Sequence, residues 1–133
     1  MALPSIGGGY QLGDGNVNEI TLGEMTDPQT ATATATLTAA QVTGGMLVAN
    51  PSATAASYTL PTVASVEAIL VNAKIGSTFD LILVNLGTGA GIVTILAGTG
   101  WTLVGSAATA ITSSSRFIAR KTGDLSWTLY RAS

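Results

Sequence analysis

The second half of this 133-residue sequence is a succession of short apolar runs separated by glycine-containing turns. Runs that recur about every ten residues are typical of the strands in all-β domains. One of them, residues 79–86, is almost continuously apolar and is therefore expected to form a strand buried on both faces. The others are residues 92–96, 101–104, 116–120 and 125–130. The pattern predicts an all-β body, a β-sandwich or jelly-roll-like fold, whose last two strands form a hairpin.

Two earlier segments have clear periodicities of their own. Residues 30–38 alternate threonine with small residues, and this two-residue period predicts one continuous strand. Residues 63–73 carry apolar side chains at helical spacing after Thr62, which is a good N-cap residue, and Gly76 follows as a stop signal. The sequence therefore predicts one short helix in an otherwise β-structured body.

The chain is poor in charge and lacks two residue types that many enzymes use. Its five basic and seven acidic residues amount to 9%, against about 25% in an average domain, whereas 47% of its residues are hydrophobic. There is no histidine to act as a base near neutral pH, and no cysteine to act as a nucleophile or soft metal ligand. We therefore expect a structural, assembling protein rather than an enzyme. Much of its surface should be covered by other protein, and no cofactor or metal is expected.

The candidate chemical motifs are weak. Residues 14–18 match the start of a calcium-binding loop, but Glu19 and Met25 stand where the loop requires glycine and a bidentate glutamate. The glycines of residues 87–91 precede a strand rather than a helix, so they predict a hairpin loop and not a phosphate-binding loop. Asp80 lies beside an apolar strand, where pairing with an arginine or with backbone N–H groups is a more ordinary role than catalysis.

Neither nucleic acid nor a membrane is an expected partner. Five basic residues without a local aromatic cluster make a poor nucleic-acid surface. No apolar stretch reaches the roughly 20 residues of a membrane-spanning helix. Trp101 and Trp127 are expected to be anchors of the core or of an interface.

Residues 1–28 differ in composition from the rest of the chain. They are rich in glycine, contain four of the seven acids and no base, and carry only scattered apolar residues. Such a segment cannot build its own core, and it predicts an extended arm that becomes ordered on another surface. Fully extended, an arm of this length spans roughly 90 Å. We therefore divide the chain into an N-terminal arm, residues 1–28, and a body, residues 29–133.

Three runs of the sequence resemble a module of virion proteins from tailed bacteriophages. They are LTAAQVTGGMLVANPSATAASYTLPTVASVEAIL, NAKIGSTFDLILVNLGTGAGIVTILAGTGWTLVG and SSSRFIARKTGDLSWTLYR. Their most specific parts are YTLPT, GSTFDLILVN and GTGWTLVG. The chain is most similar to the small capsid decoration, or cement, proteins of these phages. The resemblance implies a homotrimer on the capsid surface of the virion, with extended termini that grip neighbouring major capsid protein subunits.

Under this resemblance, we expect the arm to carry the capsid-binding residues. The apolar anchors are Tyr10, Leu12, Ile20 and Leu22, and the acids that would meet basic capsid groups are Asp14, Glu19, Glu24 and Asp27. The alternative is a trimerisation or receptor-binding domain of a phage tail fibre. Because the sequence starts at Met1 without a repetitive shaft segment, we favour the decoration protein. A small carbohydrate hydrolase or lectin is disfavoured by the scarcity of carboxylates.

Overall fold

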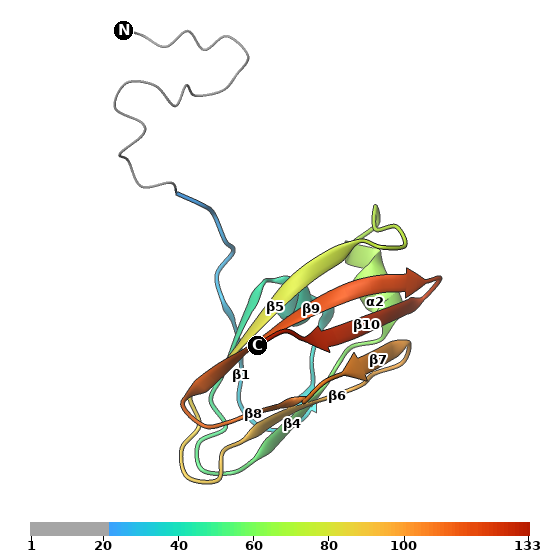
Figure 1. Ribbon diagram of the computed structural model, residues 1–133. Helices are drawn as coiled ribbons and strands as arrows, with labels where there is room; N and C mark the ends of the chain where they lie inside the picture. Colours follow the sequence, from blue (N-terminus) through green and yellow to red (C-terminus); the bar gives the residue numbers. More distant parts are fainter. Residues whose placement is uncertain (1–21) are drawn as a thin grey trace, which may run out of the picture.

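The computed structural model describes residues 22–133, which form two β-sheets and two short helices (Figure 1). The larger sheet has the strand order β1-β3-β5-β9-β10-β7, and the smaller sheet has the order β2-β4-β6-β8. The elements are β1 (Gln29–Ala31), β2 (Ala35–Thr36), α1 (Ala39–Thr43), β3 (Met46–Ala49), β4 (Ala56–Thr59), α2 (Val63–Ile69), β5 (Thr78–Asn85), β6 (Val93–Leu96), β7 (Trp101–Val104), β8 (Ala108–Thr109), β9 (Ser113–Gly123) and β10 (Ser126–Arg131). The largely β fold that the sequence predicts is confirmed.

The first six strands alternate between the two sheets. In the larger sheet β1, β3 and β5 run parallel to one another, and in the smaller sheet β2, β4 and β6 do the same. The register is continuous, since Ala35, Tyr58 and Ile95 are neighbours across the three strands of the smaller sheet. The chain is therefore wound in three coils, and each coil contributes one strand to each sheet.

This winding differs from the expected topology. A jelly roll is built from antiparallel strands, but five of the eight strand pairings here are parallel, so that part of the prediction is not confirmed. The hairpin predicted at residues 87–91 is wrong, because β5 and β6 belong to different sheets. The glycine-rich loop instead carries the chain from β5 in the larger sheet to β6 in the smaller sheet. Strands that are parallel neighbours in one sheet cannot be joined by a hairpin, so the chain must cross to the other sheet between them.

The alternating segment, residues 30–38, is divided between both sheets. Its first part lies in β1 and pairs with β3, whereas its later part lies in β2 and pairs with β4. Residues 32–34 make the crossing. The prediction of one continuous strand is therefore wrong. The next coil has the same path, since residues 50–55 cross between the sheets from β3 to β4.

The helix predicted after Thr62 is present as α2. The Thr62 hydroxyl caps it by accepting a hydrogen bond from the Ser65 N–H at 3.3 Å. The helix ends at Ile69, earlier than predicted, because Leu70 leaves the helical conformation with a ψ of 59°. Lys74 therefore lies in the loop that follows rather than in the last helical turn.

A second helix, α1, lies between β2 and β3, so the expectation of a single helix is wrong. The N-terminus of α1 is closed by reciprocal hydrogen bonds. The Gln41 N–H donates to Thr38 Oγ1 at 3.2 Å, and the Thr38 N–H donates to Gln41 Oε1 at 2.8 Å. Val42 is the fully buried residue of this helix and attaches it to the core.

The C-terminal strands complete the larger sheet and enclose the core. β9 pairs antiparallel with β5 and with β10, which confirms the predicted hairpin, and β10 runs parallel to β7. Trp101 and Trp127 are 6% and 1% exposed, so both are core residues. The indole Nε1 of Trp101 donates a hydrogen bond to the Pro61 carbonyl oxygen at 2.8 Å, and this bond ties β7 to the chain segment before α2.

Candidate functional site

Three of the eight residues predicted to bind the capsid lie in the described part of the chain. Leu22 is 86% exposed, and Glu24 and Asp27 are exposed as well. They precede β1, in a segment that leads away from the two sheets (Figure 1). The other five lie outside the described residues, as does the calcium-like segment 14–18: Tyr10, Leu12, Asp14, Glu19 and Ile20.

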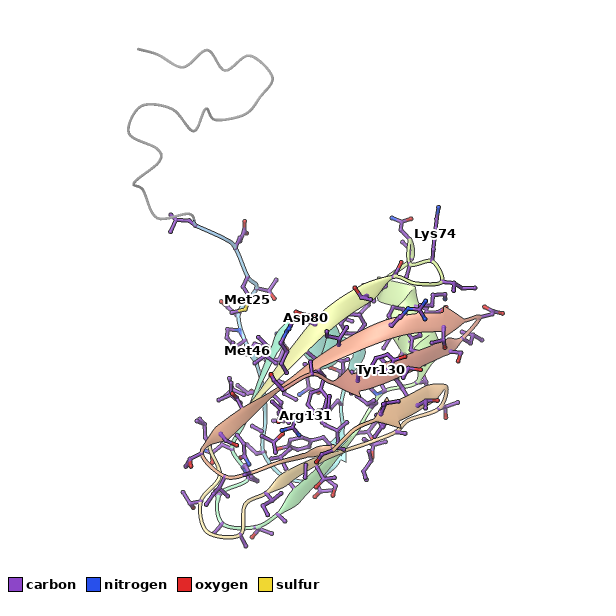
Figure 2. The ribbon with its side chains drawn as sticks, in the orientation of Figure 1. Met25, Met46, Lys74, Asp80, Tyr130 and Arg131 are labelled. Carbon is purple, nitrogen blue, oxygen red and sulfur yellow. The ribbon has the colours of Figure 1, made fainter. Side chains whose placement is uncertain are left out.

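The segment before β1 is attached to the body close to the end of α1. Thr26 Oγ1 donates a hydrogen bond to the Gly44 carbonyl oxygen at 3.1 Å. Met25 remains 54% exposed, and Figure 2 labels it on the segment that precedes β1. The segment therefore presents carboxylates and apolar side chains to solvent from a fixed point on the body. This combination suits a partner surface that offers basic groups and apolar pockets.

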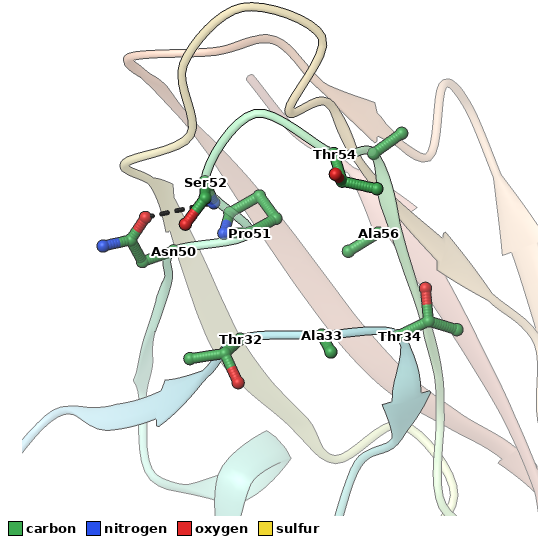
Figure 3. Close-up of a pocket in the computed structure, with 9 residues that line it drawn as sticks. Thr32, Ala33, Thr34, Asn50, Pro51, Ser52, Thr54 and Ala56 are labelled. Carbon is green, nitrogen blue, oxygen red and sulfur yellow. Dashed lines mark hydrogen bonds between the residues drawn. The ribbon is translucent and has the colours of Figure 1, made fainter.

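An open pocket lies where the first two coils cross between the sheets (Figure 3). It is lined by Thr32, Ala33, Thr34, Asn50, Pro51, Ser52, Thr54, Ala55 and Ala56. The Ser52 N–H donates a hydrogen bond to Asn50 Oδ1 at 3.3 Å and shapes the second crossing. The lining offers hydroxyl, amide and methyl groups but contains no acid and no base. The pocket can exchange hydrogen bonds with a neighbouring surface, but its own side chains cannot supply general acid–base catalysis.

Glu67 of α2 forms a partly buried cluster with two residues of the larger sheet. Its Oε2 accepts a hydrogen bond from Lys121 Nζ at 2.5 Å and another from Trp127 Nε1 at 3.1 Å. The Lys121 hydrogen bond lowers the pKa of Glu67, and the indole hydrogen bond and the lysine charge act in the same direction, whereas burial opposes them. The carboxylate is held ionised and links helix to sheet, which is a structural role.

Sequence reasoning missed this cluster, although β9 carries a signal for it. Ser115, Phe117 and Ala119 are buried at every second position of the strand, and the same period places Lys121 on the inner face. A lysine in such a position requires an ionic partner to offset its desolvation. The two-residue period in β9 therefore indicates that a nearby acid, here Glu67, must face it.

Asp80 forms a second ion pair, on the outer side of the larger sheet. Its Oδ2 accepts hydrogen bonds from Arg116 Nη2 at 2.7 Å and from Arg116 Nε at 3.2 Å. The expectation that Asp80 pairs with an arginine is confirmed. Glu67 and Asp80 thus pair with different cations, Lys121 and Arg116, and do not form a pair of carboxylates with each other.

Within residues 22–133, no three acidic side chains gather into a possible metal site. No helix in this part of the chain is both long and apolar enough to cross a membrane. Comparison with known proteins gives no relative, since no protein-family model, curated protein or solved structure matches the chain.

Proposed function

We propose that this protein is a non-enzymatic structural component of a phage virion. It decorates the capsid and stabilises it by binding across neighbouring major capsid protein subunits. In this role it is a homotrimer on the capsid surface, and its two sheets form a small β-sandwich that carries the arm. The resemblance of residues 37–131 to phage decoration proteins is the starting point of this proposal.

The exposure of an acidic and apolar segment ahead of β1 carries the proposal. A leucine that is 86% exposed contributes little to the fold, and Leu22 is therefore available to fill a pocket on a partner. Glu24 and Asp27 follow it in the chain and carry negative charge that would be attracted to a basic surface. The hydrogen bond between Thr26 and Gly44 sets the point at which this segment leaves the body. An arm bound to the capsid would consequently place the body at a defined position.

The distribution of charge supports the same role. Residues 1–28 contain four acids and no base. The ion pairs found within residues 22–133 join Asp80 to Arg116 and Glu67 to Lys121, so Glu24 and Asp27 take part in neither. Their charge can therefore be matched by basic groups of a partner. Ordering an arm on a partner costs conformational entropy, and the combined binding free energy of several such contacts offsets that cost.

Binding to undecorated capsids tests the proposal. The triple variant Leu22→Ser, Glu24→Gln and Asp27→Asn removes the apolar anchor and both carboxylates of the described arm. We expect it to bind about 100-fold more weakly, which corresponds to roughly 2.7 kcal/mol. Cosedimentation with capsids measures the affinity, and thermal melting verifies that the body is intact. The variant Asp124→Asn is the matched control, because it removes an exposed acid from the turn between β9 and β10 and should leave binding unchanged.

Two outcomes would contradict this assignment. A folded triple variant that decorates capsids with full affinity, together with full affinity after deletion of residues 2–27, would show that the arm is not the binding site. Binding of the wild-type protein to host cells, with none to capsids, would favour the alternative of a receptor-binding domain from a tail fibre.

A further inference from the structure

The strand registers define the outer face of the larger sheet. In β5, the side chains that alternate with the buried Leu81 and Leu83 point away from the core. Across the neighbouring strands, the registers give seven apolar residues on this side: Met46, Val48, Ile82, Val84, Val104, Ile118 and Tyr130. We call these seven residues the apolar face. Figure 2 labels Met46 and Tyr130 on two of its strands, β3 and β10.

The apolar face is poor in charge for an outer surface. Asp80 and Arg116 lie within it and pair with each other, and Arg120 lies at its border. Val104 and Tyr130 are 48% and 38% exposed, and the other five residues are half-buried by their neighbours in the sheet. A sheet face that meets water normally carries polar residues at these positions. The same registers place a polar row, Thr78, Arg120, Thr128 and Thr102, at one end of this side of the sheet. The seven apolar residues therefore form a patch in the remainder of the face, and an apolar patch of this kind is typical of an interaction surface.

The sequence of β5 gives a second, independent indication. Its nearly continuous apolar run is typical of a strand buried on both sides. Within residues 22–133, only the inner side is buried completely, by the core between the sheets, whereas Ile82 and Val84 on the outer side are not. Residues 22–133 therefore do not supply the second covering layer that is typical of such a strand.

We propose that the apolar face is the surface through which copies of this protein associate. The proposal rests on the homotrimer of the proposed function and names the surface that holds it together. Five strands spaced about 4.8 Å apart, with an average of between six and seven residues along each, give a face of roughly 24 by 22 Å, or about 530 Å² in plan. Side chains standing on the face add to this area, which approaches the roughly 800 Å² that each partner contributes to a stable interface.

A second copy is the occupant that the chemistry favours. Permanent interfaces between subunits are apolar and depleted of charge at their centres, and the central charges here, Asp80 and Arg116, already neutralise each other. A partner chosen through the acidic arm would instead be basic, and this face offers no excess of acid to attract it.

The apolar face also has two halves that could close a ring. The strands β3 and β5 contribute one half, and β9, β10 and β7 contribute the other. The pair of Asp80 and Arg116 lies between them. If the first half of one copy packs against the second half of the next, a threefold rotation covers every half and leaves no open contact.

Light scattering after size exclusion tests the proposal on the full chain at micromolar concentration. We expect about three times 13.3 kDa for the wild type. Val104→Lys places a charge against apolar groups of the neighbouring copy and should weaken association about 100-fold, so that single copies predominate. The matched control is Leu96→Lys, since Leu96 is 43% exposed on the outer side of the smaller sheet. We expect this control to remain a trimer.

A second variant, Ile82→Lys, tests the centre of the apolar face, and circular dichroism identifies the variants that are folded. A folded Val104→Lys variant that still forms trimers would overturn the proposal, as would a wild-type monomer or a Leu96→Lys variant that dissociates. The proposed function is tested separately by capsid binding. A wild-type trimer that dissociates on Val104→Lys but never binds capsids would contradict capsid decoration and leave this surface in place.

Discussion

The two ends of the space between the sheets are closed in different ways. At the end near α2, aromatic side chains fill the space, and the Trp127 ring centroid lies 5.4 Å from that of Phe79 and 6.1 Å from that of Trp101. We call this the aromatic end. At the opposite end, where β5 stops, closure depends on the buried side chain of Asn85, and we call this the amide end.

At the amide end, one side chain holds several loops together. Asn85 Nδ2 lies within hydrogen-bond distance of the carbonyl oxygens of Gly91, Thr109 and Ala110, at 2.9, 3.1 and 3.1 Å. Its Oδ1 accepts a hydrogen bond from the Gly87 N–H at 2.8 Å. The amide thus satisfies backbone groups of the loop before β6, of the last residue of β8 and of the residue that follows it. Without the amide, these groups would be buried without partners.

The difference shows where the fold tolerates change. Side chains at the aromatic end can change rotamer or be replaced by others of similar volume. Backbone segments approach closely at both ends, because a Cβ on Gly87 or Gly91 at the amide end, or on Gly98 near α2, would overlap a backbone carbonyl oxygen. We therefore expect substitution of these glycines to be damaging at either end, and substitution of side chains to be more damaging at the amide end, where one amide serves several backbone groups.

The largest effect is expected for Gly91→Ala. The new Cβ would overlap the Ser52 carbonyl oxygen, a backbone atom that cannot rotate away, so the free energy of unfolding should fall by about 3 kcal/mol or more. Chemical denaturation measures this loss. Gly123→Ala is the control, since its Cβ would meet only the Ser126 Cβ at 3.8 Å and should cost less than about 1 kcal/mol. Equal losses in the two variants would contradict the close approach at the amide end.

An intermediate effect is expected for Asn85→Leu, which keeps the volume but removes the amide. The carbonyl and N–H groups that it serves would lose their partner inside the core, and the free energy of unfolding should fall by about 2–3 kcal/mol. Asn72→Leu, at an exposed position, should change it by less than about 0.5 kcal/mol. A variant at Asn85 as stable as the wild type would mean that this end is held by other contacts.

The smallest effect is expected at the aromatic end, for Glu67→Gln. The pKa of Glu67 is lowered from its ordinary value of 4.5, mainly by the Lys121 hydrogen bond. The stability that its ionised form contributes is therefore complete above pH 4.5 and is lost as the pH falls through the lowered folded-state pKa. The wild type should be more stable than the variant at pH 7, and this gap should narrow below pH 4.5.

Denaturation at a series of pH values measures that gap. The variant Asp124→Asn provides the reference for the general loss of stability in acid, because it removes an exposed carboxylate elsewhere. A gap between wild type and Glu67→Gln that stays constant from pH 7 to pH 3 would show that the ionised carboxylate does not stabilise the aromatic end.

The elements with strong local signals could be predicted from the sequence. The apolar run of β5, the hairpin of β9 and β10, and the cap at Thr62 each depend on neighbouring residues only. The winding could not be predicted, because a two-residue period shows that residues 30–38 are extended but not which sheet each part joins. The short helix α1 carries a capping box, Thr38 and Gln41, but it is too short to show a helical period.

The candidate surfaces were predictable to different degrees. The composition of the arm is enough to predict that Leu22, Glu24 and Asp27 are exposed, because nothing nearby in the sequence could bury them. The apolar face was not predictable, since the sequence shows that both sides of β5 are apolar but not which side the core covers. That assignment depends on the strand registers. They place Ile118 of β9 beside Asp80 of β5, and Val104 of β7 beside Tyr130 of β10.

The winding has a mechanical consequence for a protein held by its N-terminal segment. A pull on that segment reaches the body at the outermost coil, whose strands β1 and β2 contain three and two residues and pair on one side only. Short edge strands open at lower free energy than core strands. Load from a moving partner would therefore peel this coil before it strained the aromatic or amide ends. We therefore expect the first coil to open under load before the rest of the body unfolds.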